Sequence, residues 1–254
     1  MKVVRTIAEL EAAPDTGLVP TMGALHDGHR ALFRAARAES DRVVASLFVN
    51  PAQFDRQADL EAYPRDEARD LEVAREEGVD LVFAPGPEEL YPAGFATWVE
   101  PQETGAEGDS RPGHFRGVAT VCLKLFNLVG PERAYFGQKD AQQVAVLRRL
   151  VRDLNVPVEI RVVPTVRDAD GLALSSRNDR LSAEERERAL GLPRALASAA
   201  REPDPVAAAR ASLNGLEADY VVVLDLGDAK ILAAAVRVGS TRLIDNVLLE
   251  GELT

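Results

Sequence analysis

Apolar runs alternate with amphipathic stretches through the first two thirds of the chain, and this alternation constrains the fold more than any other feature. Runs typical of buried strands occur at residues 18–19, 43–49, 79–84, 134–136 and 156–163. Stretches with apolar side chains at helical spacing occur at residues 66–77, 117–129 and 141–154. Because helices that separate parallel strands cover both faces of a sheet, the pattern predicts an α/β fold with a doubly wound parallel sheet and right-handed crossovers.

The pattern changes near residue 165, where we expect a second unit. Ser182 and Glu185 have the spacing of a capping box, which predicts a helix start. The alanine-rich stretch 195–211 is typical of helix, interrupted by prolines. Two strands are predicted afterwards, at residues 219–224 and 242–249. We therefore expect a first domain over residues 1–165 and a smaller α+β domain over residues 166–254.

The composition limits the classes of protein to which the chain can belong. The net charge of −11 argues against non-specific nucleic-acid binding, which depends on Lys and Arg. The single cysteine, Cys122, cannot form an intramolecular disulfide, which suits a reducing compartment. No apolar run approaches the roughly 18 residues that a membrane span needs, and the amino terminus lacks an apolar signal segment. We expect a cytoplasmic protein that binds neither membranes nor nucleic acid.

Two of the three histidines stand in one segment, PTMGALHDGH at residues 20–29. It follows a strand and precedes a helical pattern, so it predicts a turn at the carboxyl edge of the sheet, where ligands bind. Free N–H groups at a helix start attract phosphate, and His26 and His29 can direct donors at the same ligand. A lone histidine at such a turn is more often a capping residue, and no third zinc ligand lies at the right spacing. The pair favours nucleotide binding.

Two further segments carry polar side chains whose meaning is open from the residues alone. Asn50 and Gln53 follow the strand at 43–49 and could bind a hydroxy acid, but Asn-Pro is a common turn signal and a lone Gln usually faces solvent. Arg111 and His114 stand among glycines and could bind phosphate or carboxylate. Equally, they could belong to a solvated loop whose arginines pair with the many acidic residues.

The segment GQKDAQQ at residues 137–143 again joins a strand to a helix. Lys139 has the wrong charge for a helix start, which suggests an anionic ligand shared with the backbone amides. Asp140 is a candidate N-cap, and Gln143 lies one turn further on. Residues 175–177 (Ser-Ser-Arg) could clasp a triphosphate, although serine-rich loops are ordinary.

The order of these segments is more specific than any one of them: PTMGALHDGH, FVNPAQF, RPGHFRGV, GQKDAQQ, DGLALSSRN. With this set the chain resembles the pantoate–β-alanine ligase family, over residues 4–249. The resemblance implies a Rossmann-like sheet of the HIGH-containing nucleotidyltransferase group. It also implies an ATP-dependent ligase that condenses (R)-pantoate with β-alanine through pantoyl adenylate and releases AMP and diphosphate. Its partners would be these small molecules, with a second copy of the chain in a homodimer.

The resemblance further implies roles for single residues. His29 matches the family's proton donor, and His26 and Lys139 are expected to assist in catalysis. The expected nucleotide contacts are Met22, Gly23, Ala24, Leu25, His26, Asp27, Gly28, His29, Gly137, Gln138, Lys139, Asp140, Val166, Leu174, Ser175, Ser176 and Arg177. Gln53 matches a contact to pantoate and β-alanine, and Gln143 a contact to pantoate. Asn50, Arg111 and His114 fall in motifs near the substrates.

Two positions depart from the family pattern, Gln138 in place of a frequent Glu and Leu174 in place of a frequent Met. Mg²⁺ is expected as a cofactor that bridges phosphate oxygens with few protein ligands. Asp70 is a candidate carboxylate for it, although the neighbouring Arg69 weakens that interpretation.

Two other functions stay open at this point. A nucleotidyltransferase that acts on a phosphate acceptor would share the histidine turn but would leave Gln53 and Gln143 without a role. A non-catalytic nucleotide-binding module would share the phosphate contacts.

Overall fold

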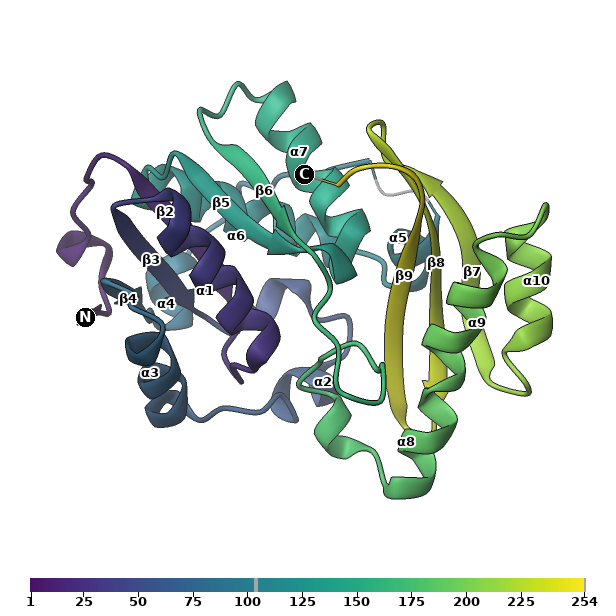
Figure 1. The fold of residues 1–254 in the computed structure, drawn as a ribbon. Helices are drawn as coiled ribbons and strands as arrows, with labels where there is room; N and C mark the ends of the chain where they lie inside the picture. Colours follow the sequence, from purple (N-terminus) through teal and green to yellow (C-terminus); the bar gives the residue numbers. More distant parts are fainter. Residues whose placement is uncertain (103–104, 254) are drawn as a thin grey trace.

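A computed structural model describes residues 1–102 and 105–253 and contains two β-sheets (Figure 1). The larger is parallel, with strand order β1-β4-β3-β2-β5-β6. Its strands are β1 (Lys2–Val4), β2 (Thr16–Thr21), β3 (Arg42–Leu47), β4 (Leu81–Phe83), β5 (Arg133–Gly137) and β6 (Glu159–Val163). Strand β2 lies between β3 and β5, so the direction in which strands are added reverses there. Open α/β sheets bind ligands outside the carboxyl ends of strands at such a point.

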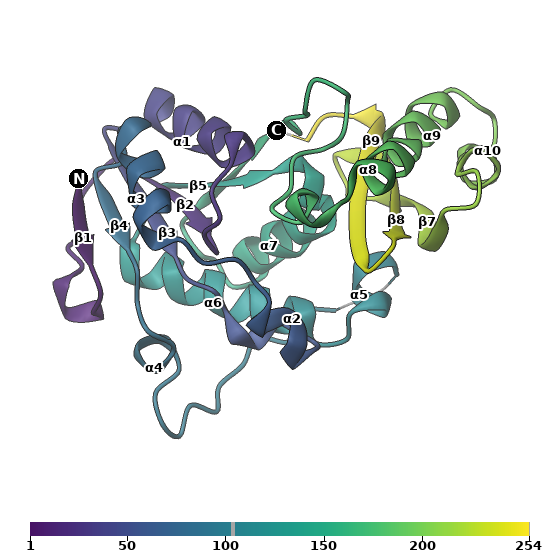
Figure 2. The same ribbon diagram turned by 90° about the horizontal axis from the view of Figure 1, so that it is seen from below.

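Helices cover both faces of this sheet, as the alternation predicts (Figures 1 and 2). On one face, α6 (His114–Val129) and α7 (Ala141–Asp153) bury apolar side chains such as Phe126 and Leu147 against Leu18. On the other, α1 (Asp27–Glu39) and α3 (Glu67–Glu76) pack Phe33 and Ala74 against the sheet. The apolar stripe of each predicted helix therefore faces the core.

The smaller sheet is antiparallel, with order β7-β8-β9. Its strands are β7 (Glu217–Asp225), β8 (Ala229–Val238) and β9 (Thr241–Gly251). Three helices pack on one face, α8 (Ala183–Ala189), α9 (Gly191–Ala199) and α10 (Pro205–Ser212). The opposite face packs Tyr220 and Ile231 against Ala106 of α5 (Ala106–Ser110) and Ala141 of α7. The smaller sheet is thus turned toward the carboxyl edge of the larger one.

The α/β fold class and the main predicted elements are confirmed, with corrections. Strand β8 is absent from the predictions, which placed two strands in this region rather than three. Helix α6 begins at His114, before the predicted start at residue 117. The short elements β1, α2 (Gln57–Glu61), α4 (Pro87–Leu90) and α5 are also additional. The predicted capping box opens α8, since Ser182 Oγ accepts the Glu185 N–H (3.2 Å) and Glu185 accepts the Ser182 N–H (2.9 Å).

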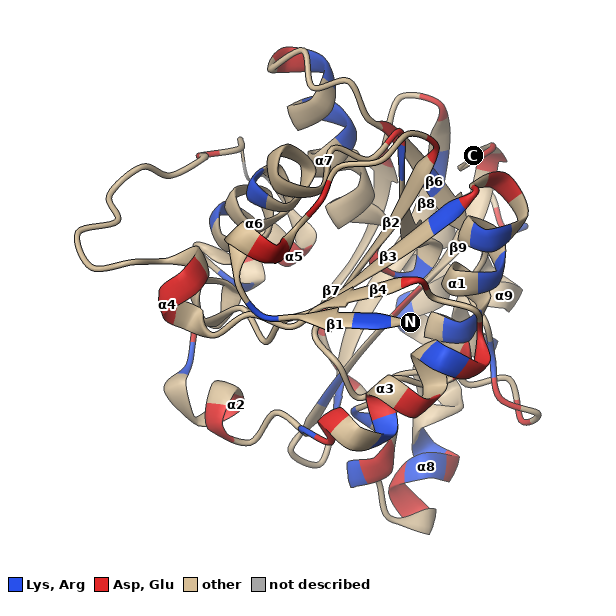
Figure 3. Ribbon diagram, turned by 90° about the vertical axis from the view of Figure 1, so that its left-hand side faces the viewer, with Lys and Arg blue, Asp and Glu red and all other residues tan. Residues whose placement is uncertain are grey.

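Acidic and basic residues alternate along helices α1, α3 and α8 (Figure 3). Glu77, just after α3, accepts hydrogen bonds from Arg30 (2.8 Å) and Arg34 (2.7 Å) of α1. These bonds fasten the helix that follows the histidine turn to its neighbour. In the two described ranges, no helix combines the length and the apolar character that crossing a membrane requires.

Candidate active site

An open cavity of about 250 Å³ lies at the carboxyl edge of the larger sheet, where the order of strands reverses at β2. Turns that follow three strands line it: Met22 and His29 after β2, Gln53 after β3, and Lys139 after β5. Because these strands are parallel neighbours, side chains far apart in the sequence meet at one edge.

The two histidines cap the start of α1. His26 is the N-cap residue, and its Nδ1 accepts a hydrogen bond from the Gly28 N–H (3.1 Å). The Nδ1 of His29 accepts one from the His26 N–H (3.2 Å), and the ring centroids lie 4.2 Å apart. Because Nδ1 is an acceptor in both rings, these hydrogen bonds assign the proton of each neutral imidazole to Nε2.

Both rings stay neutral at pH 7. Burial lowers the pKa of His26 to about 4, and the charge of Lys139 adds to this effect. Burial also lowers the pKa of His29 well below its usual value, helped by His26 and Lys139. Since both rings line the cavity, they offer it neutral N–H donors rather than charges.

Asp70 of α3 holds the turn that carries the histidines. Its side chain is buried and accepts hydrogen bonds from the backbone N–H groups of Ala24 (3.0 Å) and Leu25 (2.7 Å). Gly23 has a φ of +83°, and a Cβ there would lie 2.7 Å from the Asp70 Oδ2. Glycine is therefore required by the backbone conformation and by the close approach of the carboxylate. Burial raises the pKa of Asp70.

Asn50 positions Gln53. It is buried, and its Nδ2 donates to the Gln53 side-chain Oε1 (3.0 Å) and to the Gly117 carbonyl (3.1 Å). Its Oδ1 accepts the Tyr91 hydroxyl (2.9 Å). Helix α6 approaches this turn so closely that a Cβ on Gly117 would lie 2.4 Å from the Ala52 carbonyl oxygen. The hydrogen bond from Asn50 thus fixes the orientation of the Gln53 side chain, and Gln53 itself lines the cavity.

Arg111, which follows α5, and His114, the first residue of α6, both contact the Gln53 backbone. The Gln53 carbonyl accepts hydrogen bonds from His114 Nδ1 (2.9 Å) and from Arg111 Nη2 (3.2 Å). Arg111 Nη1 donates to His114 Nε2 (3.2 Å), which requires a neutral ring. Burial and the Arg111 charge lower the pKa of His114 to about 4. Besides lining the cavity, the two residues therefore fix the shape of the Gln53 turn.

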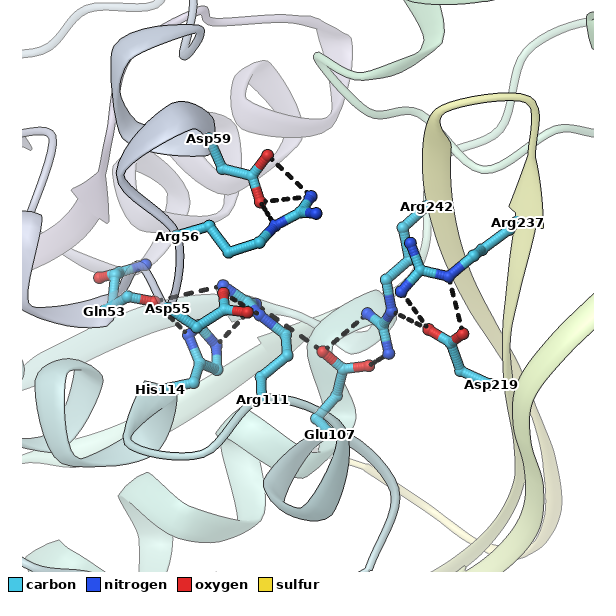
Figure 4. A network of polar contacts seen from close by, with 10 residues as sticks. All are labelled: Gln53, Asp55, Arg56, Asp59, Glu107, Arg111, His114, Asp219, Arg237 and Arg242. Carbon is cyan, nitrogen blue, oxygen red and sulfur yellow. Dashed lines mark hydrogen bonds and ion pairs between the residues drawn. The ribbon is translucent and has the colours of Figure 1, made fainter.

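A polar network continues from Arg111 to the smaller sheet (Figure 4). Glu107 of α5 lies 3.8 Å from Arg111 Nη1 and accepts hydrogen bonds from Arg242 of β9 (2.6 and 3.1 Å) and from the Tyr220 hydroxyl (2.9 Å). Arg242 also donates to Asp219 (2.6 Å). Burial would raise the pKa of Glu107, but the hydrogen bonds and charge of Arg242 hold it below its usual value. The network ties the two sheets together beside the Gln53 turn.

A second open cavity, of about 210 Å³, lies next to this network. It shares several lining residues with the first cavity, among them Arg111, Lys139, Gln143 and Arg177. The two cavities are therefore neighbouring parts of one crevice between the sheets.

Lys139 belongs to a single 3-10 turn (Gln138–Asp140) between β5 and α7. Its ammonium group makes no hydrogen bond or ion pair with the residues that the structure describes. Asp140 is the N-cap residue of α7, as predicted, but its side chain makes no capping hydrogen bond. A cation and a helix amino terminus next to each other suit an anionic ligand that both can contact.

The loop after β6 brings a third group of polar side chains to the crevice. The Val166 carbonyl accepts the Leu174 N–H (3.0 Å), and Ser175 Oγ accepts the Arg177 N–H (3.2 Å). Burial raises the pKa of the Tyr63 hydroxyl, and the neighbouring Ser176 opposes this shift. Residues 174–177 all line the first cavity.

One wall of the cavity is apolar, and the site predictions do not contain it. It is formed by Phe48, Val118, Val121, Cys122, Leu125 and Phe136. The only sequence feature that could have indicated this wall is the long apolar run of α6. In sequence, such a run cannot be distinguished from a helix that packs in the core. Burial raises the pKa of the Cys122 thiol to about 12, so it remains protonated. Such a wall beside polar groups suits a ligand with a branched aliphatic part.

Most of the predicted site residues meet at the first cavity. Those that line it are Met22, His26, Gly28, His29, Asn50, Gln53, Arg111, His114, Gly137, Lys139, Asp140, Gln143, Val166, Leu174, Ser175, Ser176 and Arg177. Gly23, Ala24, Leu25, Asp27 and Gln138 lie in the turns that frame the cavity but not in its lining. The individual roles of all these residues stay predictions.

The side chains do not form a cage for Mg²⁺. Across residues 1–102 and 105–253, no group of three or more His, Cys, Asp or Glu side chains could hold a metal ion. Asp70, the candidate ligand, lines neither cavity, and both of its oxygens accept backbone N–H groups. Both oxygens of Asp70 are therefore used to anchor the histidine turn. This arrangement does not fit a metal ligand.

Comparison with known proteins places this geometry in a family. The family profile described as pantoate-beta-alanine ligase matches residues 1–248. Pantothenate synthetase from Roseiflexus sp. (strain RS-1) is 52% identical, with 98% of this chain and 100% of the relative covered. The enzyme from Corynebacterium glutamicum (strain R) is 53% identical, with 92% and 93% covered.

Solved structures agree with the sequence relatives. Pantothenate synthetase from Thermus thermophilus superposes with a TM-score of 0.92 at 46% identity, over 98% of this chain and 99% of that one. Pantoate-beta-alanine ligase from Francisella tularensis, described as complexed with beta-gamma ATP and beta-alanine, has a TM-score of 0.85 at 35% identity, with 99% of each chain covered. The chain belongs to the pantoate–β-alanine ligase family.

Proposed function

We propose that this enzyme joins (R)-pantoate to β-alanine through a pantoyl-adenylate intermediate, forming pantothenate and releasing AMP and diphosphate. One observation carries the proposal. A single crevice combines two neutral imidazole donors, the Lys139 ammonium, two glutamines and an apolar wall. The ligands named for the Francisella structure, ATP and β-alanine, support the assignment.

In the first step, a carboxylate oxygen of pantoate attacks the α-phosphorus of ATP, and the bond to the β-phosphate oxygen breaks. The Nε2–H groups of His26 and His29 donate to phosphate oxygens, and Lys139 and Arg177 offset the charge that develops on them. His29, as a neutral donor, acts through its hydrogen bond rather than through a positive charge. The apolar wall receives the two methyl groups of pantoate, while Gln53 and Gln143 bind its polar groups.

In the second step, the amine of β-alanine attacks the carbonyl carbon of the adenylate. The bond from that carbon to the AMP oxygen breaks, and the amine loses a proton. The chain's contribution is orientation: the fixed Gln53 turn holds the carbonyl group within reach of the amine. This role accounts for the support that Asn50, Arg111 and His114 give to Gln53.

We propose that Mg²⁺ would accompany ATP and offset part of the phosphate charge without a cage of protein side chains to hold it, since the described residues supply none. The enzyme would act in the cytoplasm as a homodimer, with residues 166–254 closing over the nucleotide held by residues 1–165. The reduced, buried Cys122 suits that compartment. Light scattering tests the dimer, and small-angle scattering with and without ATP tests closure.

The deciding experiment separates AMP from ADP among the products. With ATP and pantoate but no β-alanine, we expect diphosphate and a stalled acyl adenylate, and added β-alanine should then release AMP. Formation of ADP, or no reaction with pantoate, would refute the proposal. His29→Ala should slow the first step strongly, with a modest loss of stability because the His26 N–H loses its partner. An unchanged rate would remove the assigned donor role.

A further inference from the structure

Asn246 of β9 lies far from the assigned site residues in the sequence but contacts one of them through the backbone. Its side chain is buried, at 2% exposure. Its Nδ2 donates to two carbonyl oxygens, those of Gln138 and Lys139, both at 3.0 Å. Its Oδ1 accepts a hydrogen bond from Gln138 Nε2 (3.3 Å). One side chain from the smaller sheet thus contacts two of the three residues of the 3-10 turn, Gln138 and Lys139.

These contacts supply hydrogen-bond donors to two carbonyl oxygens that stand before the first turn of α7. The turn precedes α7, so the Gln138 and Lys139 carbonyls lie outside the hydrogen-bond ladder of that helix. A partly buried carbonyl oxygen without a donor destabilises the fold. The side-chain amide of Asn246 has two N–H donors on one nitrogen and can therefore serve both oxygens.

The strand that presents Asn246 is itself anchored at the preceding residue. Asp245 is almost fully buried and pairs with Arg167 through two hydrogen bonds (2.7 and 3.0 Å). Arg167 also donates to the Gly171 carbonyl (3.2 Å), within the loop that leads to residues 174–177. Adjacent residues of one strand therefore connect β9 to two of the proposed phosphate-binding segments.

We propose that Asn246 is a positioning residue for the ligase reaction: it sets the backbone of the Lys139 turn so that the ammonium group meets the phosphates of ATP. This inference rests on the proposed function and adds to it a residue of the smaller sheet. Asn246 touches neither substrate nor reacting atoms in this role. Its effect passes through the position of Lys139.

The test compares Asn246→Ala with Val247→Ala. Val247 is the next residue of β9, but it packs on the opposite face, against the helices α8 to α10. Both variants should lower the melting temperature. Asn246→Ala should also reduce kcat/KM for ATP by about tenfold or more, because a small displacement of a catalytic group is costly. Asn246→Asp, which places an oxygen against the two carbonyls, should be at least as damaging, whereas Val247→Ala should stay within about twofold of wild type.

A double-mutant cycle with Lys139→Ala separates positioning from general destabilisation. If Asn246 acts through Lys139, adding Asn246→Ala to Lys139→Ala should change kcat/KM by less than about twofold. Equal losses in both backgrounds would overturn the proposal, as would equal losses from Asn246→Ala and Val247→Ala.

A crystal structure of Asn246→Ala gives a result that does not depend on activity. We expect residues 138–140 to shift from their position in the wild-type enzyme, and an unmoved turn would overturn the proposal. Wild-type enzyme that forms no AMP would refute the proposed function. Active wild-type enzyme with an equally active Asn246→Ala would refute only the positioning role.

Discussion

Replacing Gly117 by Ala should damage the Gln53 turn with little effect on the rest of the fold. The added Cβ would lie 2.4 Å from the Ala52 carbonyl oxygen and 2.6 Å from the Gln53 nitrogen, whereas ordinary contact begins at 3.4 Å. The backbone of the turn must therefore move by about 1 Å, the difference between 3.4 and 2.4 Å. Such overpacking costs roughly 1–3 kcal/mol. The gain from replacing glycine inside a helix, about 1 kcal/mol, offsets part of it.

The catalytic effect should be larger than the effect on stability. A displacement of about 1 Å in a substrate-positioning group can cost on the order of a hundredfold in rate. We expect kcat/KM for pantoate to fall between about tenfold and a hundredfold in steady-state assays of AMP release. The free energy of unfolding, measured with urea, should fall by less than about 2 kcal/mol. This is the cost of overpacking minus the gain from replacing a helical glycine.

Gly191→Ala is the matched control. It also adds a methyl group to a helical glycine, but there the nearest atom is a flexible side-chain methyl of Leu216, at 3.1 Å. Its activity should stay close to that of wild type. If Gly117→Ala keeps kcat/KM within about twofold, or if the control loses as much, the argument from close approach is wrong.

Three other substitutions test the supports of the site. Asp70→Asn directs an amide N–H at a backbone N–H of the histidine turn, so it should cost about 1–3 kcal/mol in urea unfolding and raise KM for ATP. The Mg²⁺ concentration at half-maximal activity should stay unchanged, and a rise would restore Asp70 as a metal ligand. Glu107→Ala leaves Arg242 paired with Asp219 alone, and its expected cost is about 3 kcal/mol, the low end for a broken buried pair. A loss below about 1 kcal/mol, the value of an exposed pair, would contradict this. The pKa of His114 is about 4 in the folded enzyme, below the roughly 6.5 of an unfolded chain, so the unfolded state takes up a proton first as the pH falls. Stability should therefore be lost between about pH 6.5 and 4, by up to about 1.4 kcal/mol per pH unit from this residue, and His114→Gln should flatten the pH dependence of urea unfolding by that amount. An equally steep profile in the variant would show that His114 does not titrate as inferred.

The sequence predicted those parts of the site that depend on local order along the chain. A strand, a turn and a helix in succession place the turn at the carboxyl edge, so the histidine and Lys139 segments meet without any knowledge of distant contacts. The supports were not predictable in this way. Asp70 reaches the histidine turn from another helix, and Asn246 reaches the Lys139 turn from another sheet. Such pairings depend on the tertiary packing of elements that sequence patterns describe one at a time.

Strand β8 shows where local preference is overridden. Its sequence, AKILAAAVRV, is rich in alanine, which favours helix and is uncommon in strands. It is the central strand of its sheet, with buried side chains from Ile231 to Val236 on both faces. Small side chains suit that place, because helices pack on one face and α5 and α7 approach the other. The surrounding layers, rather than intrinsic propensity, decide the outcome.

The neutral imidazoles have a consequence for how the enzyme responds to its surroundings. Because the pKa values of His26 and His29 are lowered, both rings remain uncharged when the pH falls slightly below 7. The Arg111 guanidinium, which also lines the crevice, keeps its positive charge over the same interval. The electrostatic attraction between these groups and a bound nucleotide would therefore be the same in mildly acidic solution as at pH 7.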